Sequence, residues 1–354
     1  MDKQQLSNLL HIQNASRENR LVVFVGAGVS RNSGIPTWND LIKTMKSELP
    51  DKLANDMDAL KVAQLYKDAR GHKEYMDKVK EVLLYNKAVP NPLHKRILAL
   101  KPCHMVTTYD DLIEQELINE FIQYAVVRED KDIPQMVHPN ALVKMHGDYA
   151  TDNIVLTETD YYNYSNNFPL IRAFVLSLFA SKLVLFVGFS FADLNLKMIL
   201  NELKGILSEN IQRAYLLSCE EPDSITKQYF EKKGINVLYF SEKDIDSING
   251  SDYPENSLSG IGLLTDKILF AIKNYSPISK NDLVSYIYDR IISYNKELLS
   301  FGDGLRYFFP NNKSMLWNTH SSGLQTHLPY FEDIAKQLQS NQQKRKFLIT
   351  HPNI

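Results

Sequence analysis

Near its beginning the chain has a run of apolar residues that leads directly into a turn of small residues. Residues 21–25 form a short apolar stretch typical of a buried strand, and Gly26-Ala27-Gly28-Val29-Ser30 follows it. Glycine lets backbone N–H groups approach a pyrophosphate closely, and the N-terminus of a following helix favours negative charge. The stretch therefore predicts a site for the phosphates of a dinucleotide, although any tight strand-to-helix turn also favours glycine.

The residues after this turn argue against hydride-transfer chemistry. A dehydrogenase fingerprint has a third glycine or alanine three residues after the second glycine, but Arg31 occupies that position. No acidic residue ends an evident second strand about twenty residues later, where the partner of a ribose hydroxyl is expected. The chain continues with Ser33-Gly34-Ile35-Pro36-Thr37-Trp38. We expect this loop to fold over a bound nucleotide, while Trp38 either covers the ligand or packs in the core.

A histidine follows another apolar run, in Lys144-Met145-His146-Gly147-Asp148. Histidine titrates near neutral pH and therefore suits general-base catalysis, which typically contributes about a hundred- to ten-thousand-fold in rate. From these residues alone, the stronger interpretation of His146 is a hydrogen-bonded core histidine at the end of a strand. His94, His104 and His138 have no comparable context and are expected to be structural.

These residues belong to a chain that alternates short apolar runs with longer segments of helical spacing, as in a mostly parallel sheet covered by helices. The predicted strands are 21–25, 104–107, 142–146, 183–188, 214–218 and 237–240. The predicted helices are 38–49, 52–70, 74–85, 92–100, 111–121, 170–181, 192–207, 224–233 and 264–275. We therefore predict an α/β fold with a Rossmann-like, mostly parallel sheet and helices on both faces.

The expected organisation is one α/β domain, residues 1–275, followed by a second region. A charged helical segment at about residues 52–90 suits a small helical insertion over one face or an ordinary solvated cover. Residues 242–260 are rich in Ser, Asp, Asn and Gly and are predicted to be a surface loop. Residues 276–354 are first helical and then irregular in pattern, which predicts the start of a helical C-terminal region, either of a longer chain or of a protomer in an assembly.

Composition and charge narrow the function classes. With 44% hydrophobic residues, a chain of 354 residues can bury a sizeable core. Its 40 Lys+Arg are balanced by 42 Asp+Glu, so neither nucleic acid nor an anionic membrane is an expected partner. Cys103 and Cys219 are too few for a disulfide framework or a four-thiolate zinc site. No secretory signal or membrane span is evident, so we expect a soluble, cytoplasmic, metal-free protein.

Four segments, in order along the chain, resemble the motifs of the SIR2, or sirtuin, family of NAD-dependent proteins. Gly26-Ala27-Gly28-Val29-Ser30 with Ser33-Gly34-Ile35-Pro36 is similar to the family's first NAD motif. Thr107-Thr108-Tyr109-Asp110 resembles the second motif, and Lys144-Met145-His146-Gly147-Asp148 resembles the catalytic His-Gly motif. Gly188-Phe189-Ser190-Phe191-Ala192-Asp193-Leu194-Asn195 resembles the late ribose-binding turn. The resemblance implies the sirtuin fold with NAD as ligand.

The likeness is closer to the bacterial defence-associated sirtuins, antiphage proteins whose SIR2 domain depletes cellular NAD once infection is sensed. It rests on Asn91-Pro92-Leu93-His94, Thr159-Asp160-Tyr161-Tyr162-Asn163-Tyr164 and Val284-Ser285-Tyr286-Ile287-Tyr288. The resemblance implies hydrolysis of NAD to nicotinamide and ADP-ribose, assembly as a homo-oligomer, and a phage protein as the trigger. The alternative is a non-catalytic NAD-binding or assembly module. A SIR2 subunit working beside a nucleic-acid-handling partner is a third class.

The resemblance also implies roles for individual residues. His146 becomes the general base, directly or through a ribose hydroxyl. The NAD contacts become Gly26, Ala27, Gly28, Ser30, Ile35, Pro36, Trp38, Thr107, Gly188, Ser190, Asp193 and Asn195. Of these, Ser190 and Asn195 are expected at the adenine-side ribose, and Trp38 over the nicotinamide end.

The chain departs from the family pattern in two places. The zinc-ribbon cysteines of protein deacylases are absent, so we expect no zinc ribbon and no deacylation. The middle motif usually has Asn after Thr-Thr or Thr-Gln, but here Tyr109 follows Thr108, and Thr108 takes the Asn position when the motif is aligned from Asp110. Either Thr108 or Asp110 orients the attacking water, or the chain is a weakened or inactive version. Asp110 also suits the N-cap of a helix that starts at Asp111.

Overall fold

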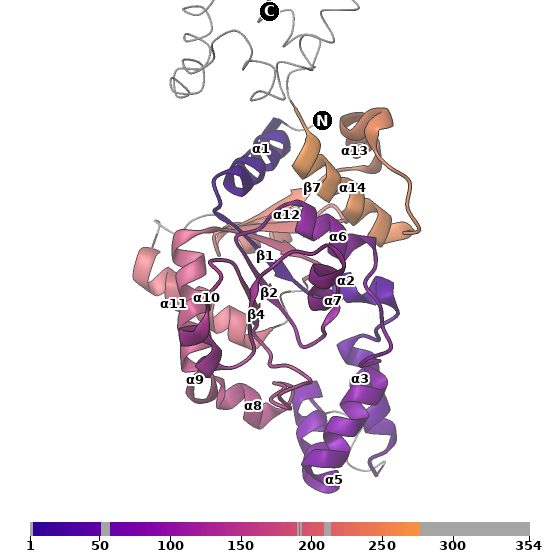
Figure 1. The fold of residues 1–354 in the computed structure, drawn as a ribbon, viewed down its shortest axis with the longest axis vertical. Coiled ribbons are helices and arrows are strands. Elements are labelled where there is room, and N and C mark those ends of the chain that lie inside the picture. The colour runs from indigo at the N-terminus through magenta and orange to yellow at the C-terminus, as the bar shows by residue number, and fades with distance from the viewer. Residues whose placement is uncertain (1–2, 51–56, 190, 192, 209–213, 277–354) are drawn as a thin grey trace, which may run out of the picture. The chain divides into compact units, whose positions relative to one another are not determined.

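The computed structural model describes residues 3–50, 57–189, 191, 193–208 and 214–276 (Figure 1). Its strands are β1 (Leu21–Val25), β2 (His104–Thr107), β3 (Ala125–Val127), β4 (Ala141–Lys144), β5 (Leu183–Val187), β6 (Ala214–Ser218) and β7 (Ile235–Tyr239). Its helices are α1 (Lys3–Arg17), α2 (Ala27–Ser30), η1 (Arg31–Ser33), α3 (Trp38–Ser47), α5 (Ala59–Val82), α6 (Pro92–Ala99), α7 (Leu112–Asn119), η2 (Asp130–Gln135), α8 (Glu158–Tyr162), α9 (Tyr164–Asn167), α10 (Pro169–Ser181), α11 (Leu194–Leu207), α12 (Ser224–Glu231), α13 (Glu242–Asn249), η4 (Gly250–Asp252) and α14 (Gly260–Asn274).

Contacts divide the chain into two units, Met1–Tyr275 and Ser276–Ile354. Apart from Ser276, the second unit lies outside the described residues, and so does the predicted helical C-terminal region. Across the described segments, every helix is too short or too polar to cross a lipid bilayer.

The strands form one parallel sheet in the order β3-β4-β2-β1-β5-β6-β7. The central strand β1 is in register with β2 from Val22↔His104 and with β5 from Leu21↔Leu183. β2, β3 and β4 lie on one side of β1, and β5, β6 and β7 lie on the other. The order in which the chain adds strands to the sheet therefore reverses between β1 and β5. Ligands of such sheets bind at the carboxyl ends of the strands beside this reversal.

Helices cover both faces of the sheet, because the side chains of each strand alternate between two cores. In β1, Leu21, Val23 and Val25 belong to a core that also contains residues of α1, α6, α7, α13 and α14. Val22 and Phe24 belong to a second core with residues of α10 and α11. This two-faced parallel sheet confirms the predicted α/β fold (Figure 1).

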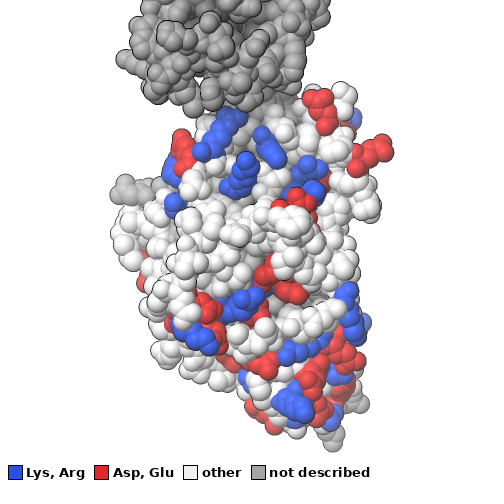
Figure 2. Space-filling view, viewed as in Figure 1, with Lys and Arg blue, Asp and Glu red and all other residues white. Residues whose placement is uncertain are grey.

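A third core lies beyond the sheet, between α3 and α5 (Figure 1). It includes Leu41, Met45, Val62, Tyr66 and Val79. The two helices predicted at 52–70 and 74–85 meet at Gly71, whose φ of 80° breaks the helical conformation within α5. Figure 2 shows Lys and Arg mixed with Asp and Glu over this part of the surface. One ion pair there joins Lys78 to Glu48 at 3.0 Å.

The prediction of a loop over 242–260 is wrong at both ends of that segment. Glu242–Asn249 is helix α13, and α14 already begins at Gly260. The side chain of Ser241 caps α13 by accepting the N–H of Asp244 at 3.2 Å, and Ile245 is buried in the first core. Ser and Asp are helix-capping residues as well as loop residues, so composition alone misassigned them.

Candidate active site

The turn after β1 packs directly against the turn after β5. Gly26 donates its N–H to the carbonyl of Val187 at 2.8 Å, and Gly28 donates to the carbonyl of Gly188 at 3.0 Å. A Cβ added at Gly26 or Gly28 would lie 2.2 or 2.9 Å from the carbonyl oxygen of Gly188. Contact between the two turns therefore requires glycine, and these two N–H groups are already paired. Ala27 is in the first turn of α2, where the helix itself cannot satisfy an N–H.

A buried carboxylate connects the turns after β1 and β2. Asp110 Oδ2 accepts hydrogen bonds from Ser30 Oγ at 2.9 Å and from Thr108 Oγ1 at 3.2 Å. Asp110 Oδ1 accepts the N–H of Leu112 at 3.3 Å, at the start of α7. Asp110 thus bonds to the first residue of α7, but the N-cap position predicted for it is taken by Asp111, whose side chain makes no capping bond. Thr108 is half-buried and Asp110 is buried, so the threonine is the more accessible of the two residues.

His146 lies just beyond β4, and its ring contacts a second buried carboxylate. His146 Nε2 is 2.6 Å from Asp193 Oδ2, and the side chains are only 8% and 9% exposed. The hydroxyl of Tyr161, on α8, donates to the same oxygen at 3.4 Å, and Asp193 Oδ1 accepts the N–H of Leu196 in α11 at 2.7 Å. Burial opposes ionisation of Asp193, but His146 and these hydrogen bonds outweigh it and lower the pKa of the carboxyl. Asp193 is therefore an anion at neutral pH.

A buried lysine ties the strand ends together. Lys144 is the last residue of β4, and its side chain is fully buried. Its Nζ lies 3.0 Å from Glu114 Oε1 and 3.6 Å from Asp148 Oδ2, and donates to the backbone carbonyl of Asp110. Burial raises the pKa of Glu114, and the charge of Lys144 opposes this rise. The lysine thus holds the segment after β2 against the segment after β4.

Asn195, in α11, has a buried side-chain amide. The residue is 4% exposed, and its Nδ2 makes no hydrogen bond with the described residues. An unpaired buried amide is costly, because it has lost its hydrogen bonds to water without replacement. A ligand hydroxyl or ring nitrogen would supply the missing acceptor. The position fits the ribose-side contact predicted for this residue.

The other residues predicted to contact NAD are Ile35, Pro36, Trp38, Thr107 and Ser190. Ile35 and Trp38 pack against the core of α3 and α5, with Trp38 half-buried, so this tryptophan has the packing role that the sequence left open. Pro36, also half-buried, lies between them in the chain. Thr107, the last residue of β2, is buried, and its hydroxyl donates to the carbonyl of residue 108 at 3.2 Å. Ser190 lies outside the described residues.

The three histidines predicted to be structural have backbone partners. Each accepts a backbone N–H at Nδ1 over 3.1 Å: His94 from Asn91, His104 from Ala141 and His138 from Asn140. Such contacts fit the structural roles expected for them. Within the described segments, no three His, Cys, Asp or Glu side chains converge as a metal site would require.

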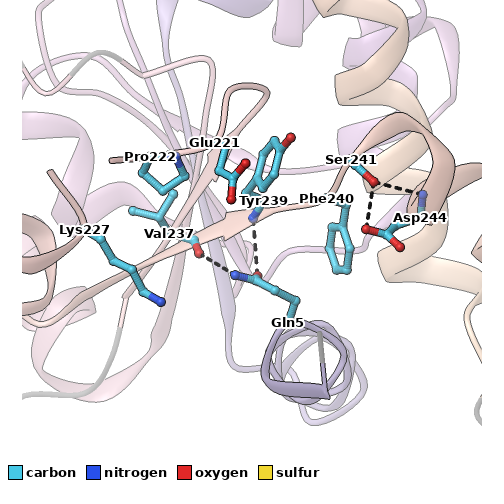
Figure 3. Close-up of a pocket in the computed structure, with 9 residues that line it drawn as sticks. All are labelled: Gln5, Glu221, Pro222, Lys227, Val237, Tyr239, Phe240, Ser241 and Asp244. Atoms are coloured by element: carbon cyan, nitrogen blue, oxygen red, sulfur yellow. Dashed lines mark hydrogen bonds between the residues drawn. The ribbon is translucent and has the colours of Figure 1, made fainter. Parts of the chain in front are cut away.

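A pocket lies apart from these residues, at the carboxyl end of the edge strand β7 (Figure 3). It is lined by Gln5, Glu221, Pro222, Lys227, Val237, Tyr239, Phe240, Ser241 and Asp244. The amide of Gln5 bonds to the backbone of Val237 and of Tyr239, each over 3.3 Å, and so covers part of the free strand edge. None of the predicted NAD contacts lines this pocket.

Residues 104–238 match the family model of the SIR2-like domain. This match confirms the resemblance that the sequence motifs indicated, and three of the four motif segments lie within it. The matched residues run from β2 to β7 and include Asp110, His146 and Asp193.

Two relatives align with this chain, one over most of its length and the other over more than half. "Defense-associated sirtuin 2" of Bacillus subtilis is 30% identical over 304 residues, which are 82% of this chain and 29% of the relative. "NAD(+) hydrolase ThsA" of Acinetobacter baumannii (strain 532279) is 32% identical over 213 residues, 56% of this chain and 42% of the relative. The chain thus spans less than half the length of either relative. A solved Sir2 homolog–NAD complex aligns with 77% of this chain and 94% of its own at 13% identity, with a TM-score of 0.41.

The sequence motifs did not reveal a cluster of charged side chains that joins the segments after β2, β3 and β4. Lys144 and Asp148 lie in the His-Gly motif, whereas Glu114 and Arg128 lie outside the quoted motifs. Arg128 lies 3.3 Å from Asp148 and 3.8 Å from Glu114, so the cluster has two charges of each sign. A lysine at the end of an otherwise apolar strand was the available signal, because a buried lysine needs acidic partners.

Proposed function

We propose that this SIR2-like domain hydrolyses NAD to nicotinamide and ADP-ribose. The observation that carries the proposal is the buried contact of His146 with Asp193, at 2.6 Å, at the carboxyl end of the sheet. This is the edge at which parallel sheets bind nucleotides, and His146 follows the strand predicted to carry the catalytic motif. Support comes from the alignment of more than half of the chain with a protein named NAD(+) hydrolase.

The reaction breaks the bond between the nicotinamide nitrogen and the ribose carbon. The bonding electrons leave with nicotinamide, which becomes neutral, and the ribose passes through a state like an oxocarbenium ion. Water then bonds to that carbon, and its proton passes to the imidazole of His146 and on to solvent. Because nicotinamide is already a cationic leaving group, the protein needs a base and a source of negative charge more than a strong acid.

Two further residues act beside the base in this proposal. Thr108 orients the attacking water, because it is a hydroxyl residue and is more exposed than Asp110 at the end of β2. Asp110 holds the Thr108 hydroxyl at 3.2 Å and places a negative charge near the developing cation. The pair thereby replaces the asparagine that the family motif usually carries.

The residues present fit a dinucleotide along the carboxyl edge of the sheet. The diphosphate lies at the turn of Gly26 to Ser30, beside the reversal of strand order. The adenine-side ribose lies at α11, where the buried amide nitrogen of Asn195 has no hydrogen-bond partner among the described residues. Gly188 lies between these two regions, against Gly26 and Gly28.

In the cell, we propose that the protein is an antiphage effector in the cytoplasm that depletes NAD on infection. The name "Defense-associated sirtuin 2" of a relative aligned over 82% of this chain supports this role. An enzyme that destroys NAD must be held inactive until it is needed, so we include assembly as a homo-oligomer and release by a phage protein. Loss of NAD-dependent metabolism in the infected cell would then limit phage production.

The test is release of nicotinamide from NAD by the purified full-length protein, alone and with lysate of phage-infected cells. His146→Ala should lower the rate by about a hundred- to ten-thousand-fold, because it removes the base. His138→Ala is the matched control, since its ring bonds to the backbone of residue 140 and stacks with Tyr124, and should retain activity.

Equal turnover by His146→Ala would remove this histidine from the mechanism. Binding of NAD without turnover, in the assembled and stimulated protein, would contradict the hydrolase and favour the non-catalytic NAD-binding module. A Thr108→Val variant that matches the wild-type rate would exclude the threonine as the residue that orients water.

A further inference from the structure

Both carboxylate oxygens of Asp193 interact with other groups of the protein. Its Oδ1 accepts the N–H of Leu196, its Oδ2 accepts the hydroxyl of Tyr161, and the same Oδ2 lies 2.6 Å from His146 Nε2. The side chain is 9% exposed. A carboxylate so engaged has little capacity left to accept ribose hydroxyls. Its position points to a different task from the NAD contact that the motif suggested.

We propose that Asp193 is a positioning residue for His146: its carboxylate accepts the Nε2–H of the ring, so that the base of NAD hydrolysis is Nδ1. The kinetic test of this inference rests on the proposed function. A neutral imidazole has one N–H and one basic nitrogen, and a carboxylate bound at one nitrogen fixes the proton there. With Oδ2 2.6 Å from Nε2, the basic lone pair is left on Nδ1.

The surroundings hold both members of the pair in place. Asp193 caps α11, a helix of 14 residues, so its carboxylate is anchored at a rigid element. The backbone carbonyl of His146 accepts the N–H of Val155 at 2.9 Å, which holds the strand end that carries the ring. Two titratable side chains lie beside the imidazole: Asp193, 2.6 Å from Nε2, and Tyr161, whose ring centroid is 6.2 Å from that of His146.

The carboxylate also stabilises the imidazolium that forms when the base takes a proton from water. Asp193 is ionised at neutral pH, since its pKa is lowered despite burial. A fixed negative charge beside a group that gains positive charge during the reaction lowers the barrier, because no dipoles need to reorganise. The chemistry is that of a base oriented by a third group, as in acyl-transfer enzymes.

The kinetic test is Asp193→Asn in the full-length protein. The amide keeps the size of the side chain and can still cap α11, but it removes the charge. We expect kcat to fall by between about tenfold and ten-thousand-fold, with KM for NAD nearly unchanged. The acid limb of the pH–rate profile should move to lower pH, because the protonated ring loses its counter-charge.

Asp223→Asn is the matched control. Asp223 caps α12 in the same manner, accepting the N–H groups of Ile225 and Thr226 at 2.8 and 2.9 Å, but it contacts no histidine among the described residues. This variant should keep the wild-type kcat and pH profile. A rise in KM with unchanged kcat in Asp193→Asn would instead assign Asp193 to ribose binding and overturn the inference.

A second measurement needs neither turnover nor a folded Asp193 variant. In wild-type protein labelled with ¹⁵N-histidine, NMR identifies the His146 signals as those that disappear in His146→Ala. At a pH where the ring is neutral, the inference predicts the Nε2–H tautomer, and a ring protonated at Nδ1 would contradict it. If wild-type protein released no nicotinamide while the Nε2–H tautomer was present, the proposed function would fail and the His146–Asp193 pairing would stand.

Discussion

Replacing Lys144 by methionine removes one positive charge from the buried cluster that joins β2 and β4. At the 3.0 Å between Lys144 Nζ and Glu114 Oε1, two unit charges interact by ~5 kcal/mol at an effective dielectric constant of about 20. Removing one partner of a buried ion pair typically costs about 3–5 kcal/mol, because the other charge stays buried. Arg128 remains 3.3 Å from Asp148 and offsets part of this loss. We therefore expect Lys144→Met to lower the free energy of unfolding by about 3 kcal/mol.

Thermal and denaturant unfolding measure this loss directly. A decrease of about 3 kcal/mol corresponds to a fall in Tm of roughly 6–12 °C for a domain of this size. Lys95→Met is the matched control: Lys95 also has an acidic partner, Glu120, at 2.6 Å, but its side chain is 66% exposed. Exposed pairs contribute little, so the control should unfold at the wild-type temperature within error. A Lys144→Met variant as stable as this control would refute the reasoning.

The pH dependence of the same variant identifies the charge responsible. Burial raises the pKa of Glu114, and Lys144 opposes the rise, so the substitution should raise this pKa further. A carboxyl whose pKa is raised in the folded state binds its proton more tightly there than in the unfolded chain. Stability then falls as pH rises from the unfolded value near 4.5 through the folded pKa. The deficit of Lys144→Met should therefore shrink toward pH 4.5, and Lys144→Met/Glu114→Gln should recover part of it at neutral pH.

Two further predictions concern the glycine turn and a buried histidine. Gly26→Ala should destabilise the protein by more than about 3 kcal/mol in denaturant unfolding, since its Cβ would lie 2.2 Å from the Gly188 carbonyl oxygen. The control is Gly205→Ala in α11, where an added Cβ meets nothing within 4 Å, and it should stabilise the protein by about 0.5–1 kcal/mol. Equal effects of the two substitutions would contradict the contact between the turns. Burial lowers the pKa of His104 from 6.5 to about 4, so the unfolded chain binds a proton that the folded protein does not, and stability should fall as pH drops through this window. His104→Gln should flatten that part of a Tm–pH curve, and an unchanged slope would assign it to other groups.

The strands that the sequence predicted best are those with continuous apolar runs. The limits of β1, β2 and β6 match the predicted residues, because a strand buried on both faces has no polar interruption. β3, at the sheet edge, was missed, since Ala125–Val127 is too short to give a pattern. α1 was also missed: it has polar residues inside, such as Gln13, which is buried because it bonds to the backbone near the end of α14.

The sequence predicted which residues belong to the candidate site but not which of them contact each other. His146 and Asp193 were both named from motifs, yet their contact depends on how the segments after β4 and β5 lie over the sheet edge. Local sequence patterns do not predict contacts between residues that are so far apart in the chain. The glycines were predicted to contact NAD, which stays a prediction; in the structure the backbone at Gly188 requires them, which a turn motif cannot reveal.

The most direct test of the central claim is a structure of the protein with NAD or a non-hydrolysable analogue bound. The account predicts the diphosphate at the turn of Gly26 to Ser30, and the nicotinamide-ribose carbon close enough to His146 for one water between them. It also predicts that Asp193 stays on Nε2. A dinucleotide bound elsewhere, such as the pocket at β7, or a ribose carbon beyond the reach of a water held by His146, would contradict it.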